Sequence, residues 1–185
     1  LEQIRAFNPE GIILSGGPAS IYEKGSPKVD PGIFDLGIPV LGICYGMQYM
    51  VNVLGGVVSR ANKREYGFAG LIVKDNGGIF QGIDQTTQCW MSHGDSIQKL
   101  PEGFQATALT DNTPVAAAEN RSKNFYGFQF HPEVVHTHEG KKMLENFLFG
   151  ICKCEKSWTM KSFARDAVEE IRNQVGAGKV ILGLS

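Results

Sequence analysis

The chain has 185 residues, enough for one ordinary domain and part of a second. Its composition, 42% hydrophobic and 20% charged, is that of a globular protein and excludes disordered and fibrous classes. The 18 basic and 19 acidic side chains give a net charge of −1, so no basic field favours nucleic-acid binding. No apolar run is long enough to span a membrane, no secretory signal is visible, and the 4 cysteines are too few for a disulfide scaffold. The sequence therefore predicts a soluble cytoplasmic protein with no nucleic-acid or membrane partner.

The first predicted elements are two short buried strands, at residues 12–14 and 40–43. Both are apolar runs bounded by glycine or proline, which is typical of strands in a parallel sheet. After Cys44 the apolar side chains recur at a helical spacing as far as Leu54, and a pair of glycines then ends the pattern. A strand, a turn that carries Cys44 and a helix form half of a βαβ unit.

The middle of the chain has a different pattern. Five short strand candidates are separated by turn-rich stretches, at residues 66–73, 86–91, 104–110, 115–119 and 125–130. We expect them to form a predominantly antiparallel β extension of the α/β core. A helix then returns, since Met143, Phe147 and Ile151 share one helical face.

A third region begins near Cys154. Apolar residues from Met160 to Val175 repeat every three or four positions, which predicts an amphipathic helix, and glycines at 176 and 178 end it. Residues 179–185 have the pattern of a new buried strand. We therefore expect one domain at residues 1–153, and at residues 154–185 a linker helix and the first strand of a second α/β domain.

The strongest local motif is at residues 42–46, which read Gly-Ile-Cys-Tyr-Gly. This is the G-x-nucleophile-x-G elbow between a strand and a helix, with Cys44 in the nucleophile position. Glycines on both sides allow the close backbone approach of so sharp a turn, and the helix N-terminus favours a thiolate. The alternative is a buried structural cysteine, because free cysteine is among the most buried residue types.

A cysteine nucleophile needs a base, and the base needs an acceptor that orients it. His131 and Glu133 follow the last predicted strand with one proline between them, so both side chains can point to the same side. The competing histidines are His93, His136 and His138, of which the last two lie in a polar stretch typical of solvated side chains. The cysteine and histidine spacings of a zinc site are absent, so we expect no metal.

The glycine-rich turn at residues 15–18, Ser-Gly-Gly-Pro, follows the first predicted strand. It lacks the lysine and the spacing of a phosphate-binding loop. The other interpretations are an oxyanion hole, with a backbone N–H aimed at the same point as the N–H of Tyr45, and a plain turn.

Four motifs in order, at residues 15–18, 39–48, 91–95 and 129–133, resemble those of class I (triad-type) glutamine amidotransferases. The resemblance covers residues 1 to about 153. It implies a flavodoxin-like parallel sheet with two further strands upstream of Leu1, and glutamine as the substrate. It also implies these site residues: a Cys44–His131–Glu133 triad, an oxyanion hole from the backbone of Gly17 and Tyr45, and substrate contacts from Gln48, Ser92, His93, Gly94 and Asp95.

The C-terminal part, from residue 151 to residue 185, is similar to the junction in the family of glutamine-hydrolysing GMP synthases. There the amidotransferase joins an ATP-pyrophosphatase domain. The resemblance implies ammonia transfer to XMP, with ATP and Mg²⁺ used in a second domain nearly all of which lies beyond residue 185, no cofactor in this part, and a homodimer at full length.

Two other readings remain open at this point. One is an amidotransferase that feeds anthranilate or carbamoyl phosphate synthesis, against which residues 158–185 argue. The other is a catalytically silent domain that binds glutamine or a partner, since a triad shows only a capacity for chemistry.

Overall fold

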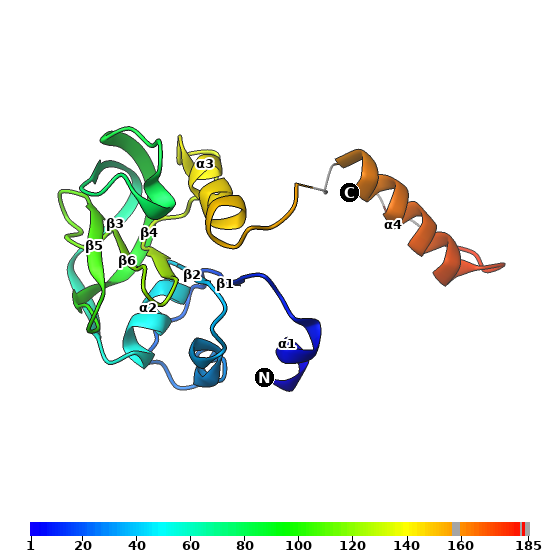
Figure 1. Cartoon of the computed structure of the whole chain (residues 1–185), viewed down its shortest axis with the longest axis horizontal. Helices are drawn as coiled ribbons and strands as arrows, with labels where there is room; N and C mark the ends of the chain where they lie inside the picture. Colours follow the sequence, from blue (N-terminus) through cyan, green and yellow to red (C-terminus); the bar gives the residue numbers. More distant parts are fainter. Residues whose placement is uncertain (157–159, 182, 184–185) are drawn as a thin grey trace. The chain divides into compact units, whose positions relative to one another are not determined.

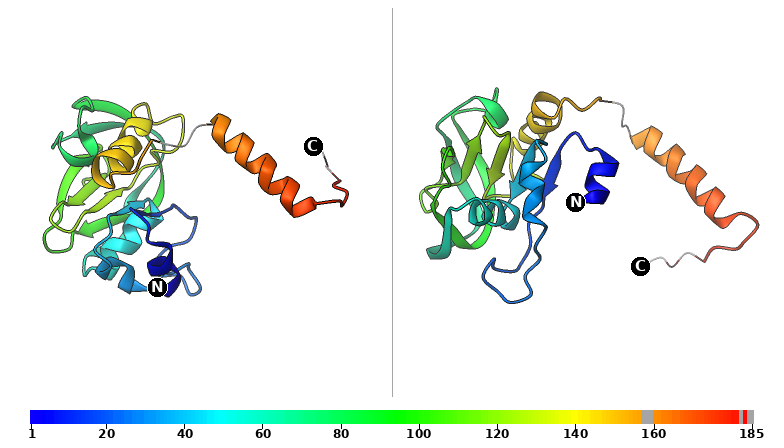
Figure 2. Two further views of the ribbon diagram at one scale, coloured as in Figure 1. Left: turned by 45° about the vertical axis from the view of Figure 1, so that its right-hand side comes forward. Right: turned by 60° about the horizontal axis from the view of Figure 1, so that its bottom comes forward.

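A computed structural model describes residues 1–156, 160–181 and 183. The chain divides into two compact units, Leu1–Cys154 and Glu155–Ser185, and each is described by itself. In the first unit the antiparallel strands, drawn mainly in green, gather on one side and the blue N-terminal segment on another (Figures 1 and 2). The assignment of these units to an amidotransferase domain and a second α/β domain stays a prediction.

The first unit is built on a seven-stranded sheet of order β1-β2-β7-β6-β5-β3-β4. Three neighbours are parallel: β1 (Ile12–Leu14), β2 (Val40–Ile43) and β7 (Phe125–Phe128). The other pairs are antiparallel and involve β6 (Ala117–Asn120), β5 (Gln105–Leu109), β3 (Val57–Val73) and β4 (Thr86–Lys99). The predicted fold class, a flavodoxin-like α/β sheet with an antiparallel extension, is confirmed.

The largest difference from the sequence prediction lies in β3 and β4, which have 17 and 14 residues. They pair from Val57 with Lys99 to Ile72 with Thr86, with a register shift between Arg60 and Glu65. The added parts of both strands are rich in polar residues, so apolar alternation does not mark them. Their cross-strand hydrogen bonds make them strands, and such pairing is a tertiary property.

Two helices pack against the sheet. The predicted helix after Cys44 is confirmed as α2 (Tyr45–Val53), which is buried from Tyr45 to Val51. The predicted helix near residue 143 is confirmed as α3 (Gly140–Glu145), and a π-helical turn continues it over Asn146–Ile151. Alternate side chains of β2 point to opposite faces: Val40 joins the cluster that contains Met47 of α2, and Leu41 joins the cluster that contains Met143 of α3.

Shorter helices complete this unit. α1 (Glu2–Phe7) precedes β1 and buries none of its residues. Because the helix has no buried face, its sequence has no apolar periodicity that would predict it. The 3₁₀ turns are η1 (Pro31–Asp35), whose N-cap Asp30 accepts a hydrogen bond from the N–H of Gly32 at 2.9 Å, and η2 (Gly78–Phe80).

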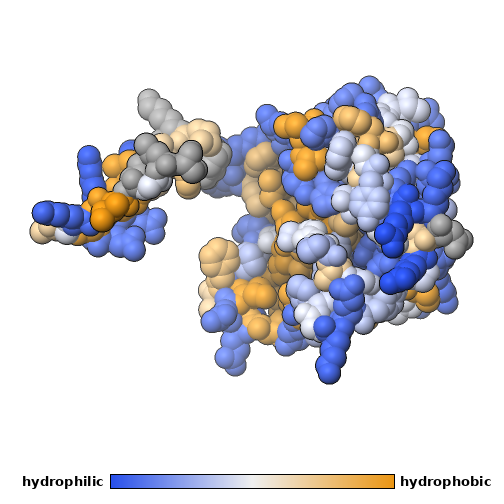
Figure 3. Space-filling view, turned by 180° about the vertical axis from the view of Figure 1, so that it is seen from behind, coloured by the Kyte–Doolittle hydropathy of each residue, from blue (hydrophilic) through white to orange (hydrophobic). Residues whose placement is uncertain are grey.

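The second unit contains α4 (Met160–Val175), as the sequence predicts. Both hydrophobic and hydrophilic side chains lie on its surface (Figure 3), and most of its large apolar side chains are exposed, such as Met160 at 68% and Ile171 at 54%. The strand expected at residues 179–185 is wrong for residues 179–181 and 183, which are in no strand, and the rest lie outside the described residues. A strand needs a neighbour to pair with, and the described part of this unit offers none. In the described residues, no helix combines the length and the apolar character that crossing a bilayer requires.

Candidate active site

Cys44 occupies the sharp turn between β2 and α2. Its backbone has φ 49° and ψ −106°, in a region that residues other than glycine rarely adopt. A Cβ on Gly42 would lie 2.5 Å from the backbone nitrogen of Met47, and one on Gly46 would collide with the carbonyl of Leu14. Glycines on both sides are therefore required for the close approach that holds Cys44 in this conformation.

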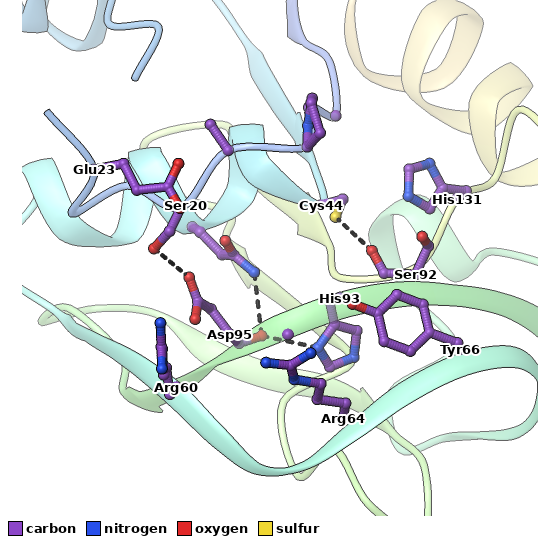
Figure 4. A pocket seen from close by; sticks show the side chains of 16 residues that line it. Ser20, Glu23, Cys44, Arg60, Arg64, Tyr66, Ser92, His93, Asp95 and His131 are labelled. Carbon is purple, nitrogen blue, oxygen red and sulfur yellow. Dashed lines mark hydrogen bonds between the residues drawn. The ribbon is translucent and has the colours of Figure 1, made fainter. Parts of the chain in front are cut away.

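His131 follows β7 and is fixed by its backbone, because its N–H donates to the carbonyl of Trp90 at 3.0 Å. Its Nδ1 lies 2.7 Å from Oε1 of Glu133, so Nδ1 carries a proton. The other ring nitrogen, Nε2, is then available for a hydrogen bond with Cys44. Thr137 Oγ1 donates to the carbonyl of His131 at 2.6 Å. In the close-up view Cys44 and His131 lie next to each other at one end of a cavity (Figure 4).

The charge state of His131 follows from these contacts. Its hydrogen bond with Cys44, and then that with Glu133, raises the pKa of His131 to about 10, although burial opposes the shift. Burial alone would raise the pKa of Glu133, but the hydrogen bond with His131 brings that pKa below its ordinary value. An imidazolium ion at neutral pH can carry the proton that an acyl-transfer reaction at a neighbouring nucleophile requires.

The glycine-rich turn at residues 15–18 lies directly against these two side chains. A Cβ on Gly16 would lie 2.9 Å from Cε1 of His131 and 3.6 Å from the Cβ of Cys44. A Cβ on Gly17 would lie 3.8 Å from Cγ of Tyr45. The turn thus brings backbone N–H groups near the N-terminus of α2, whose first N–H groups have no acceptor within the helix. Such an arrangement is more typical of an oxyanion hole than of a turn with no binding role.

A cavity of about 570 Å³ opens from the thiol (Figure 4). Its lining includes most of the residues expected from the sequence, namely Gly17, Cys44, Gln48, Ser92, His93, Gly94, Asp95 and His131. Glu133 contacts His131 but is not part of this lining, and Tyr45 lines a neighbouring cavity together with Gly17. The structure therefore brings all of these residues to one place, from α2, β4 and the segments after β1, β2 and β7.

Some lining residues were missed by sequence reasoning. They are Ser20 and Glu23 after the glycine-rich turn, and Arg60, Arg64 and Tyr66 on β3. Ser20 Oγ donates to Oδ2 of Asp95 at 2.5 Å, across 75 residues of sequence. No local spacing relates such residues. The three residues on β3 reach the cavity through the pairing of β3 with β4, whereas Ser20 and Glu23 reach it in the segment after β1.

The three other histidines have surroundings that differ from those of His131. His93 has a side chain only 1% exposed, with Nδ1 2.8 Å from the carbonyl oxygen of Asp95 and Nε2 3.3 Å from Oγ1 of Thr113. Burial lowers the pKa of His93, which keeps the ring neutral. The ring of His136 lies 4.5 Å from that of Trp90 at an interplanar angle of 34°, and neither His136 nor His138 is part of the lining of this cavity.

The remaining cysteines have the properties of structural thiols. Cys89 and Cys152 are buried, and burial raises the pKa of each to about 12. Cys154 is half-buried. Among the described residues, no group of three or more histidine, cysteine or acidic side chains is arranged to hold a metal ion.

Comparisons with known proteins agree with this geometry. The sequence profile of the family Glutamine amidotransferase class-I matches residues 1–151. The chain is 55% identical over its whole length to a glutamine-hydrolysing GMP synthase of Heliobacterium modesticaldum, and 52% identical to that of Aquifex aeolicus. It spans 36% of the length of each of these curated relatives.

Solved structures are similar as well. A protein of Thermoplasma acidophilum, described as a candidate subunit of GMP synthase, superposes with a TM-score of 0.71 at 31% identity, covering 86% of this chain and 76% of that one. A glutamine amidotransferase of Thermotoga maritima shares the fold, with a TM-score of 0.56 at 23% identity, over 87% of this chain and 72% of that one. Together with the profile match, the first of these shows the family: the chain belongs to the class I glutamine amidotransferases.

Proposed function

We propose that Cys44, His131 and Glu133 form a catalytic triad that hydrolyses the side-chain amide of glutamine. The observation that carries this proposal is the strained backbone of Cys44 beside a His131 ring that Glu133 holds at 2.7 Å. Strain at a buried thiol is maintained only where the surrounding structure enforces it, and such positions cluster at active sites.

In the proposed mechanism the Cys44 thiolate attacks the amide carbon of glutamine. The N–H groups of Gly17 and Tyr45 stabilise the oxyanion, and loss of one such donor typically lowers the rate about 10²–10³-fold. His131 gives its proton to the departing ammonia and then removes a proton from the water that hydrolyses the thioester. Glu133 keeps the imidazole in position and stabilises its positive charge.

Substrate binding is assigned to the cavity beyond the thiol. Gln48, Ser92, Gly94 and Asp95 line it and present amide, hydroxyl, backbone and carboxylate groups to a polar amino acid. His93 has both ring nitrogens engaged within the protein, so we assign it to supporting the wall rather than to donating a hydrogen bond to glutamine.

We further propose that the chain is the glutaminase part of a GMP synthase. The support is the 55% identity with such an enzyme over all 185 residues, including the segment beyond the family match. The ammonia would then aminate XMP at the expense of ATP in the second domain of a cytoplasmic enzyme that forms a homodimer at full length. ATP and Mg²⁺ would act in that domain, and no step described for Cys44, His131 or Glu133 uses them.

The test replaces Cys44 by alanine and measures ammonia released from glutamine. We expect Cys44→Ala to abolish glutamine hydrolysis and Cys154→Ala, its matched control, to retain it. In a protein that carries the second domain, XMP amination from free ammonium should survive in Cys44→Ala. Glutamine-dependent activity retained in Cys44→Ala would contradict the assignment. If the wild type binds glutamine but does not hydrolyse it, the chain is a catalytically silent glutamine-binding domain instead.

A further inference from the structure

Gln129 is a buried polar side chain for which the mechanism above has no use. It lies between β7 and His131 and is 0% exposed. Its backbone N–H donates to the carbonyl of Ala116 at 2.8 Å, which fixes its position. Burial of a carboxamide is costly unless its hydrogen bonds are satisfied, so its partners indicate what it does.

The backbone carbonyl of Asp95 sets the orientation of the side-chain amides of Gln48 and Gln129. The carbonyl oxygen of Asp95 lies 3.2 Å from Nε2 of Gln48 and 2.8 Å from Nδ1 of His93. Such an oxygen can only accept, so Gln48 must turn its amino group toward it. The second N–H of that amino group then donates to Oε1 of Gln129 at 3.1 Å.

This arrangement leaves only one orientation for Gln129. With its oxygen engaged by Gln48, its amino group faces Sγ of Cys44 at a distance of 3.7 Å. The same sulfur lies 3.6 Å from the carbonyl oxygen of Ser92, to which a thiol donates its proton. The Ser92 carbonyl can bind only the thiol form, whereas the Gln129 amino group interacts best with the thiolate.

We infer that Gln129 donates a hydrogen bond that stabilises the Cys44 thiolate, and that Gln48 acts as the positioning residue that orients it from the Asp95 carbonyl. The inference rests on the proposed function, because it assigns a further group to the same nucleophile. It adds a second group at the sulfur from the segment after β7: Gln129 is fully buried, whereas the His131 side chain, two residues later, is partly exposed. It also leaves Oε1 of Gln48, a residue of the cavity wall, as an acceptor for substrate.

The experiment measures two quantities in the full chain: glutamine hydrolysis, and the rate at which iodoacetamide alkylates Cys44 as a function of pH, followed by mass spectrometry of the Cys44 peptide. Gln129→Met keeps the volume and removes the donor. Gln129→Glu keeps the acceptor for Gln48 and replaces the amino group by an oxygen. The matched control is Thr107→Val, another buried polar group, whose hydroxyl has no hydrogen-bond partner among the described residues.

We expect Gln129→Met to lower kcat and the alkylation rate at pH 7 about tenfold, as for the loss of a hydrogen bond to a charged group. The rise of alkylation with pH should move to higher pH, and KM should change little. In Gln129→Glu, kcat and the alkylation rate at pH 7 should fall at least as far. Thr107→Val should have the kcat and the alkylation rate of the wild type. A purely structural role would lower the melting temperature without moving the pH profile.

If the wild type hydrolyses glutamine and a folded Gln129→Met shows an unchanged pH profile of alkylation, this inference is overturned but the proposed function is not. If Gln129→Met does not fold, a Gln129→Glu protein with wild-type kinetics overturns it equally. Failure of the proposed function has a different signature: the wild type would hydrolyse no glutamine, and Cys44 would be alkylated no faster than Cys154.

Discussion

The parallel and antiparallel parts of the sheet contribute differently to the site. β2 and β7 are four residues long and wholly buried, and the segments that follow them carry Cys44 and His131. β3 and β4 are far longer, alternate between buried and exposed residues over much of their length, and supply Arg64, Tyr66 and Asp95 to the cavity wall. The proposed chemistry thus lies at the carboxyl ends of parallel strands, and the wall lies along an antiparallel ribbon.

This difference has a physical reason. After β2 the chain enters α2 with only Cys44 between them, so backbone atoms approach closely and side chains there have little freedom. A ribbon with one exposed face accepts varied side chains on that face without disturbing the pairing beneath. We therefore expect substitutions near β2 and β7 to affect turnover or folding, and substitutions on β3 and β4 to affect substrate affinity.

The largest expected effect in the parallel part is that of His131→Ala. Since both proton transfers pass through this residue, kcat for glutamine should fall about 10²–10⁴-fold. Glu133→Gln should cause a smaller loss, because it removes orientation and charge stabilisation but keeps the proton carrier. The control is His138→Ala, which should be nearly neutral. A loss in His138→Ala equal to that in His131→Ala would show that the wrong histidine has been assigned.

Paired glycine substitutions test the packing difference. Gly42→Ala should lower the free energy of unfolding by about 1–3 kcal/mol or more, because the new Cβ would meet the backbone of α2. Gly70→Ala, on β3, should be neutral or stabilising by about 0.5–1 kcal/mol, since among the described residues no heavy atom beyond Gly70 and its chain neighbours lies within 4 Å of its Cβ position. Urea denaturation of the two variants provides the measurement. Equal destabilisation would contradict the comparison.

Asp95→Asn should separate affinity from chemistry. The carboxylate is held by Ser20 at 2.5 Å and lines the cavity, so its loss should raise KM for glutamine about tenfold while kcat stays near the wild-type value. Asp75→Asn is the matched control, because that carboxylate pairs with Arg121 at 3.0 Å and is not part of the lining of the cavity. A fall in kcat with unchanged KM would assign the antiparallel wall a part in the chemistry.

The smallest expected effect is a pH dependence of stability. The pKa of His131 is raised to about 10 by Cys44 and Glu133, above the value near 6.5 of an unfolded histidine. The stabilisation is therefore complete below about pH 6.5 and is lost as pH rises toward 10. The wild type should melt above His131→Gln at pH 7, and the gap should close by pH 10. A gap that is constant with pH would show that the imidazolium ion contributes nothing to stability.

Several features of the site could be predicted from local sequence. The elbow at residues 42–46 specifies a strand, a sharp turn and a helix, because only glycine on both sides permits the close approach seen at Met47 and Leu14. His131 and Glu133 are two residues apart, so their hydrogen bond is almost a local property. The helices at residues 45–53 and 160–175 were predicted from periodicity, which is also local.

What only the tertiary structure decided involves partners distant in sequence. Gln48 meets Gln129 across 81 residues, and Gln129 meets Cys44 across 85, so no spacing could indicate that these groups act together. The polar parts of β3 and β4 are strands because they pair with each other, and residues 179–181 are in no strand although their apolar pattern predicts one. Backbone geometry near a glycine depends on the residues beside it, whereas a strand or a buried polar network exists only when its distant partners are in place.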